Sequence, residues 1–424
     1  GDLTLMRLLL LTAACGAWAL PANLWTHIRD AARETPDLTA TKALHFCGQS
    51  QDHFDDANAV TWCQRYFVDT QYWAGPGSPV FLCVGGEGPA FQDDVLSTSV
   101  HCSDMTTLAP KVGAMMFAVE HRYYGSSFPS VSDLSTESLR FLSSRQALAD
   151  LAKFNEFATA SYNLSSDAKW ITFGGSYPGM LAGWARLKYP THFHGAISSS
   201  APVRAQVNYQ GYLDVTAQSL AQRRVGGSIR CAGIIEQGHA DIKQMLASSV
   251  GRRSLESMFN ICGDAMLDDV DNQALWAGFG VVYIDVQEND PSCTDELCNI
   301  GKVCDFVTTE AEQKTPLEVM ASLSRKSYGD QCVNVDFGEY ENGYFVNTTL
   351  TGGTGRVWFY QTCNEFAFYQ TCDEDSNCPF TKGLNTLEWN LKQCEAAFNI
   401  SADQVSQNVV DSNNYYGADR PTST

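Results

Sequence analysis

The sequence contains few basic residues for its length. Its 424 residues include 28 Lys and Arg but 48 Asp and Glu, which gives a formal net charge of −20. Proteins that bind nucleic acid present a basic face to the phosphates, so this balance argues against a nucleic-acid partner. The acidity suits a protein of an acidic compartment, where protonation would neutralise part of the charge. It equally suits solubility alone, and both interpretations stay open.

Long apolar runs are also missing, apart from one at the N-terminus. Met6-Arg7 precedes a mostly apolar run, and Ala17-Trp18-Ala19 fits a small-x-small cleavage site. The run is too short to span a bilayer. We therefore expect a signal peptide over residues 1–19 that starts at Met6. Residues 1–5 are expected to come from upstream of the start codon or from an added segment. The mature chain is expected to enter the secretory pathway without a membrane anchor and to reach a lysosome, a vacuole or the extracellular space.

Paired C-x-x-C motifs are absent among the 15 cysteines. Cleavage after Ala19 removes Cys15 and leaves 14, and an even number of cysteines in a secreted chain indicates disulfides. A metal site is the alternative for two clusters, which are Cys293, Cys298, Cys304 and Cys363, Cys372, Cys378. Their spacings and acidic surroundings disfavour zinc, so we expect neither a metal nor another cofactor. The N-x-S/T sequons at Asn163, Asn347 and Asn399 are expected glycosylation sites on the surface.

Internal repeats are absent, and short apolar runs alternate with helical patterns instead. The apolar runs cover residues 79–84, 114–119, 170–173 and 195–199, and an apolar helical face covers residues 148–158. Buried strands separated by helices predict an α/β fold with a parallel sheet covered on both faces. The predicted organisation is a lead-in segment (20–60), an α/β core (61–209), a helical and disulfide-tied insertion (210–412) and a return to the core (413–424). Within the insertion we expect helices over 212–265 and 310–328, and loops over 288–308 and 330–357.

One segment indicates a reaction. The run Trp170 to Phe173 leads into Gly174-Gly175-Ser176-Tyr177-Pro178-Gly179, and an apolar-periodic helix follows at once. This is the pattern of a nucleophile elbow, in which a serine sits on a strained turn between a strand and a helix. The usual pattern is G-x-S-x-G, and here Pro178 takes the last position, which a first helical turn tolerates. A loop without a catalytic role is the alternative.

Seven segments in order resemble one family. They are Gln64-Arg65-Tyr66-Phe67, Gly85-Gly86-Glu87-Gly88, Glu120-His121-Arg122-Tyr123-Tyr124-Gly125, Leu139-Arg140-Phe141-Leu142, Gly174-Gly175-Ser176-Tyr177, Ser199-Ser200-Ala201-Pro202, and Tyr360-Gln361-Thr362-Cys363 with Glu365-Phe366. The sequence is similar to the family of lysosomal Pro-X carboxypeptidase, dipeptidyl peptidase II and thymus-specific serine protease. The resemblance implies an α/β-hydrolase core with a helical cap and a serine peptidase that favours cleavage after proline near a chain end. A homodimer stays open.

The resemblance assigns roles to several residues. Ser176 matches the nucleophile, and the backbone N–H of Tyr177 is then one oxyanion donor. Gly86 or Glu87 could supply a second backbone N–H, unless their turn has no catalytic duty. Glu120, His121 and Arg122 follow a buried strand, and an Arg–Glu pair that holds the loop is the expected structural role.

The base of a triad is not found in the sequence. Family members carry the triad Asp in an Asn-Gly…Asp-Pro-Trp segment and the His in a His-Cys-x-Asp segment. Both lie beyond the marker that corresponds to residues 413–417, and neither segment occurs here. We treat His101-Cys102-Ser103-Asp104 as coincidence and place His192 and His194 on the surface. We therefore expect a truncated sequence that is inactive as given, with an incomplete core and a long apolar sheet edge. The alternatives are a complete, non-catalytic binding protein and an esterase.

Overall fold

A computed structural model describes residues 42–98, 102–284, 286–287, 289–350 and 354–421. The signal-peptide prediction and His101 lie outside these residues. Within them, a six-stranded sheet has the order β1-β2-β4-β3-β5-β6. Its strands are β1 (Leu44–Ser50), β2 (Thr61–Asp69), β3 (Val80–Val84), β4 (Met115–Val119), β5 (Trp170–Gly175) and β6 (Gly195–Ser199). The last four are mutually parallel, whereas β1 and β2 pair antiparallel to their neighbours. The predicted α/β class is confirmed.

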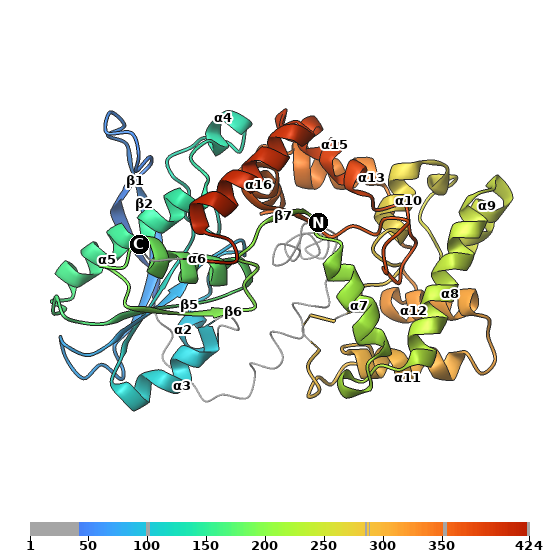
Figure 1. Cartoon of the computed structure of the whole chain (residues 1–424), viewed down its shortest axis with the longest axis horizontal. Helices are drawn as coiled ribbons and strands as arrows, with labels where there is room; N and C mark the ends of the chain where they lie inside the picture. The colour runs from blue at the N-terminus through green and yellow to red at the C-terminus, as the bar shows by residue number, and fades with distance from the viewer. Residues whose placement is uncertain (1–41, 99–101, 285, 288, 351–353, 422–424) are drawn as a thin grey trace, which may run out of the picture.

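Both faces of this sheet are covered, which explains the continuous apolar runs. Val80, Leu82 and Val84 of β3 belong to one core, whereas Phe81 and Cys83 belong to the core on the opposite face. The first core packs against α5 (Ser144–Ser161) and α6 (Ser176–Lys188), and the second packs against α2 (Val95–Thr98) and α3 (Ser103–Val112). The short helix α4 (Thr136–Leu139) leads towards α5 (Figure 1).

The segment expected as a lead-in contributes a strand. Leu44–Ser50 forms β1, which pairs with β2 and is joined to it by the disulfide Cys47–Cys63. This strand lies at the edge of the sheet, and its side chains are largely exposed, with only two of seven buried. A mixed polar sequence is what a half-exposed edge strand carries, and for that reason the segment gave no apolar signal.

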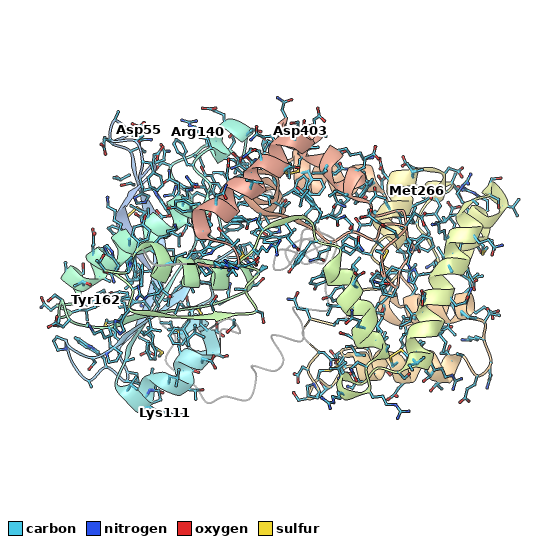
Figure 2. All side chains as sticks on the ribbon, viewed as in Figure 1. Asp55, Lys111, Arg140, Tyr162, Met266 and Asp403 are labelled. Atoms are coloured by element: carbon cyan, nitrogen blue, oxygen red, sulfur yellow. A yellow bond between two sulfur atoms is a disulfide. The ribbon has the colours of Figure 1, made fainter. Side chains whose placement is uncertain are left out.

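The region after residue 205 divides between two hydrophobic cores. One part has a core of its own, built from residues between Leu213 and Val335 together with Cys372, Cys378 and Phe380. Its elements are α7 (Gly211–Ala221), η3 (Arg223–Val225), α8 (Ile229–Leu246), α9 (Ser249–Met258), η4 (Met266–Asp268), α10 (Val270–Ala277), α11 (Ile300–Glu310) and α12 (Pro316–Tyr328). They lie together at the right in Figure 1, away from the sheet, and Met266 marks this side in Figure 2.

The other part packs onto the sheet. Its elements are α13 (Phe337–Glu341), the π-helical turns η5 (Asn342–Val346) and η6 (Thr362–Phe366), α14 (Gly355–Gln361), α15 (Leu387–Phe398) and α16 (Ala402–Tyr416). Tyr416 of α16 stacks on Trp184 of α6, with ring centroids 3.6 Å apart. Two short strands, β7 (Gln206–Asn208) and β8 (Ala367–Tyr369), pair in parallel, and β7 contacts α16. Much of the second half of the predicted insertion therefore shares the core of the sheet.

Two loop predictions within this region are wrong in part, although the disulfide-tied residues before Ile300 do form a loop. Residues 288–308 include the start of α11, and residues 330–357 include α13, η5 and the start of α14. Their Cys, Asp, Asn and Gly residues masked the helical pattern. Asn299 illustrates the reason, because its side chain caps α11 by accepting a hydrogen bond from Lys302 N. A polar residue at such a cap looks like a loop residue in the sequence.

The expected long apolar edge is not observed among the described strands. β6 is the edge on that side, and its five residues carry one large apolar side chain, Ile197, which is 38% exposed. The strand is short and mostly small or polar, which limits the apolar surface that this edge presents.

Candidate active site

Ser176 lies where β5 ends and α6 begins. Its φ of 58° falls in the left-handed region, which is costly for a residue with a side chain. Gly174 permits this turn, because an added Cβ there would lie 2.2 Å from the Pro178 carbonyl oxygen. Ser176 is partly exposed, whereas the residues on either side of it are buried. The chain therefore holds one hydroxyl at a sharp corner, directly at the N-terminus of a 13-residue helix.

Pro178 explains the departure from the usual elbow pattern. It occupies the first turn of α6, where no backbone N–H is needed for the helix. Its ring faces the Gly85–Gly88 turn, and an added Cβ at Gly86 would lie 2.2 Å from Pro178 Cγ. This contact brings Gly86 beside the helix start that carries Ser176 and Tyr177. Two of the turns that we predicted to act together are thus adjacent.

Glu87 follows in the same turn and is buried, with 3% of its surface exposed. Burial raises the pKa of its carboxyl group to about 8. The carboxyl group is therefore neutral at acidic pH and can act there as a hydrogen-bond donor.

Glu120 holds the loop after β4, but its partner is not Arg122. Its carboxylate is 2.9 Å from Arg65 Nη1 and also accepts hydrogen bonds from the backbone N–H groups of Phe91 and Ser126. Through these bonds the carboxylate joins β2 and two loops. The expected Arg–Glu pair therefore involves an arginine of β2.

Arg122 instead pairs with Asp150 of α5. Two nitrogens of the guanidinium lie 2.6 Å from the two carboxylate oxygens of Asp150, and the remaining N–H groups donate to backbone carbonyls. His53 Nε2 lies 2.7 Å from the same carboxylate. Burial alone would raise the pKa of Asp150, but Arg122 and His53 hold that pKa below its usual value. This cluster joins α5 to the loops that follow β1 and β4.

His121 contacts the elbow without being arranged as a base. Its Nδ1 lies 2.6 Å from the Arg122 carbonyl oxygen and its Nε2 lies 3.0 Å from Tyr177 Oη, so both ring nitrogens are engaged. Burial lowers the pKa of His121 to about 4. The ring is thus neutral and anchors the side chain of Tyr177.

The remaining described histidines lie elsewhere in the fold. His194 is exposed, and His192 is partly buried and pairs with Glu156, as expected for surface residues. His239 is buried in the second core against Phe380, and its Nδ1 lies 2.9 Å from Thr381 Oγ1.

Sequence reasoning missed the residues that hold the Tyr177 side chain by hydrogen bonds. Gln361 Nε2 donates to Tyr177 Oη at 2.8 Å, and Tyr124 Oη donates to Gln361 Oε1 at 2.6 Å. Glu365 accepts hydrogen bonds from Ser144 N and Ser144 Oγ at the start of α5. Gln361, Glu365 and Tyr124 all lie in segments that carried the resemblance, but no pattern within those segments indicated that they meet at the elbow.

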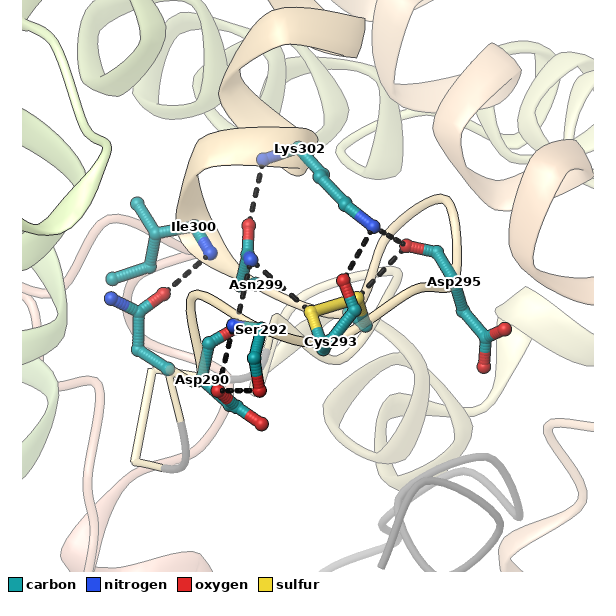
Figure 3. The surroundings of a disulfide bond; sticks show 9 residues. Asp290, Ser292, Cys293, Asp295, Asn299, Ile300 and Lys302 are labelled. Carbon is teal, nitrogen blue, oxygen red and sulfur yellow. Dashed lines mark hydrogen bonds between the residues drawn. A yellow bond between two sulfur atoms is a disulfide. The ribbon is translucent and has the colours of Figure 1, made fainter. Parts of the chain in front are cut away.

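The cysteine clusters form disulfides rather than a metal site. The seven described pairs are Cys47–Cys63, Cys83–Cys102, Cys231–Cys304, Cys262–Cys332, Cys293–Cys298, Cys363–Cys394 and Cys372–Cys378. Figure 3 shows one of them, Cys293–Cys298, where Lys302 Nζ donates to the carbonyl oxygens of Cys293 and Asp295. The loop is thus fixed by a covalent bond and a buttressing lysine.

The three predicted glycosylation sites lie on the surface. Asn163, Asn347 and Asn399 are all exposed, as a glycosylation acceptor must be. Over the described part of the chain, no helix is both long and apolar enough to cross a bilayer.

A strained serine between a central parallel strand and a helix, in a sheet covered by helices, defines a serine hydrolase of the α/β type. The model of the serine carboxypeptidase S28 family matches residues 49–424, so the chain belongs to that family and is by family a serine peptidase. Human thymus-specific serine protease is 35% identical over 396 residues, which are 91% of this chain and 75% of that protein. Bovine lysosomal Pro-X carboxypeptidase is 27% identical over 375 residues, or 85% of this chain and 70% of that protein. The predicted family resemblance is confirmed.

Proposed function

We propose that Ser176 is the nucleophile of a peptidase that forms an acyl-enzyme. The observation that carries this proposal is the φ of 58° at Ser176, at the junction of β5 and α6. A left-handed, side-chain-bearing residue at that junction is costly, and such strain is found where function requires it. Few other reaction classes need a hydroxyl at the N-terminus of a helix, where negative charge is stabilised.

In the proposed reaction, Ser176 Oγ forms a bond to the carbonyl carbon of the peptide while its proton passes to a general base. The electron pair of the carbonyl moves to the oxygen. The backbone N–H groups of Tyr177 and of Gly86 or Glu87 donate hydrogen bonds to the resulting oxyanion. The C–N bond then breaks, and the leaving nitrogen takes the proton from the base. Water hydrolyses the ester and restores Ser176.

The base in this proposal is the histidine of the His-Cys-x-Asp segment that members of this family carry. His121 is not a competitor, because both of its ring nitrogens are occupied.

We further propose cleavage after proline near a chain end, in an acidic compartment of the secretory pathway. The proline preference follows the family and the name of its Pro-X carboxypeptidase member. The seven disulfides support an oxidising compartment. A buried Glu87 that is neutral in acid supports a protein adapted to low pH.

A fluorophosphonate probe tests the nucleophile, because it phosphonylates an activated serine. We expect label on the peptide that contains Ser176 when the protein is treated, and none in Ser176→Ala. The matched control is Ser198→Ala, which removes the hydroxyl of an exposed serine of β6 and should leave labelling unchanged. Label on another residue, or label that persists in Ser176→Ala, would contradict the proposal.

A further inference from the structure

Tyr177 is held by its side chain as well as by its position in the first turn of α6. Its ring is buried, and its hydroxyl lies 2.8 Å from Gln361 Nε2 and 3.0 Å from His121 Nε2. The rings of Trp358 and Phe366 pack beside it, with centroids 5.3 Å and 5.6 Å away. A residue next to the serine is therefore fixed by groups from the loop after β4, from α14 and from η6.

The direction of each hydrogen bond in this cluster can be assigned. The Arg122 carbonyl oxygen can only accept, so His121 Nδ1 donates to it and Nε2 carries the lone pair. Tyr177 therefore donates its single hydroxyl proton to His121 and must accept from Gln361. Gln361 is then oriented without ambiguity, because its Oε1 accepts from Tyr124.

Glu365 extends this arrangement to the next helix. Its Oε2 lies 3.3 Å from Gln361 Nε2, and its carboxylate accepts from Ser144 N at the N-terminus of α5. The disulfide Cys363–Cys394 ties the turn between Gln361 and Glu365 to α15. Fully satisfied buried networks of this kind rigidify the groups that they connect.

We infer that Gln361 is a positioning residue for acyl transfer, which directs the backbone N–H of Tyr177 at the developing oxyanion by holding the Tyr177 side chain. This inference rests on the proposed role of Ser176. An oxyanion donor must point at the place where charge develops, and loss of one donor typically lowers kcat 10²–10³-fold. A donor that remains but is misdirected is expected to have a smaller effect, about 10–100-fold.

The test replaces Gln361 with methionine, which has similar volume and offers no hydrogen bond to Tyr177 or Tyr124. The matched control is Gln393→Met, because Gln393 is equally buried but donates to a backbone carbonyl within α15. We expect Gln361→Met to lower kcat about 10–100-fold, with KM changed less than about twofold. The control should change neither.

Two further readouts separate positioning from general damage. A peptidyl aldehyde forms a tetrahedral adduct with an oxyanion, whereas the matching alcohol does not. Gln361→Met should weaken the aldehyde about tenfold or more and the alcohol less than about twofold. Amide hydrogen exchange in the peptide that spans Tyr177 should also become faster in Gln361→Met than in the control, whether or not the protein is active.

The outcomes are distinguishable. Unchanged hydrogen exchange at Tyr177, or equal weakening of aldehyde and alcohol, would overturn the positioning role of Gln361. Equal losses in Gln361→Met and Gln393→Met would do the same, because they would indicate a purely structural effect. If the wild-type protein is not labelled by the fluorophosphonate at Ser176, the proposed function fails instead. Hydrogen exchange still reports whether Gln361 holds Tyr177 in place.

Discussion

Gly86 and Pro178 meet so closely that a Cβ atom added at Gly86 would lie 2.2 Å from Pro178 Cγ. Gly86 follows β3, an inner strand of the sheet, and Pro178 lies in the first turn of α6, the helix that begins at Ser176. The contact fixes the distance between two backbone segments that we propose to share an oxyanion.

Replacing Gly86 with alanine should therefore push the two segments apart. We expect Gly86→Ala to slow fluorophosphonate labelling of Ser176 about tenfold or more, because a small misplacement of oxyanion donors is costly. Gly88→Ala is the control, since an added Cβ at Gly88 meets nothing within 4 Å. Equal labelling rates in the two variants would show that the contact does not matter for the reaction.

The backbone strain at Ser176 should lower the free energy of unfolding by a measurable amount. Glycine adopts a φ of 58° without strain, whereas alanine does not. We expect Ser176→Gly to have a free energy of unfolding about 1 kcal/mol higher than Ser176→Ala. Urea unfolding of the two variants, both of which lack the hydroxyl, gives the difference directly. A Ser176→Ala protein as stable as Ser176→Gly would argue against stored strain.

Glu87 should make stability depend on pH. Its pKa in the folded protein is about 8, above the ordinary 4.5, so the folded state keeps a proton that the unfolded state releases. The favourable contribution is complete below pH 4.5 and is lost as pH rises towards 8. Between pH 5 and 8 the wild type should lose on the order of 1 kcal/mol per pH unit through this group.

The variant Glu87→Gln should remove that slope. Urea unfolding at pH 5, 6.5 and 8 measures it, with Glu388→Gln, an exposed glutamate of α15, as the control. His121 and His239 have lowered pKa values and act in the opposite direction, but they are present in every variant. A wild type and a Glu87→Gln variant with parallel pH profiles would contradict the assignment.

Arg122 should be among the most sensitive positions for folding. Arg122→Met leaves the buried carboxylate of Asp150 without its main partner, and loss of one member of a buried pair costs about 3–5 kcal/mol. Arg140→Met removes an ion pair with Glu137 in which both side chains are exposed, and should cost less than about 1 kcal/mol. Thermal or urea unfolding of the two variants checks the contrast, and similar losses would refute it.

The central strands and the elbow were predictable because their signals are local. The runs 79–84, 114–119 and 170–173 became β3, β4 and β5, and Ser176 stands at the strand-to-helix turn that its neighbours indicate. Strand β1 and helix α11 escaped prediction. In both, polar residues with an edge or capping position imitate a loop.

The partners of the site residues were not predictable in the same way. Glu120 pairs with Arg65 and not with Arg122, and Gln361 reaches Tyr177 across 184 positions of the chain. Such pairs depend on which helix packs on which strand, and periodicity within a segment carries no information about that.

The amino-acid order by itself determined where a hydroxyl would be forced out at a corner, because small residues, a strand pattern and a helix pattern adjoin there. The tertiary structure alone decided what holds that corner in place. The packing of α14 and η6 onto the core of the sheet brings Gln361 into hydrogen-bond contact with Tyr177. Contacts between segments so distant in the sequence arise only when the chain has folded.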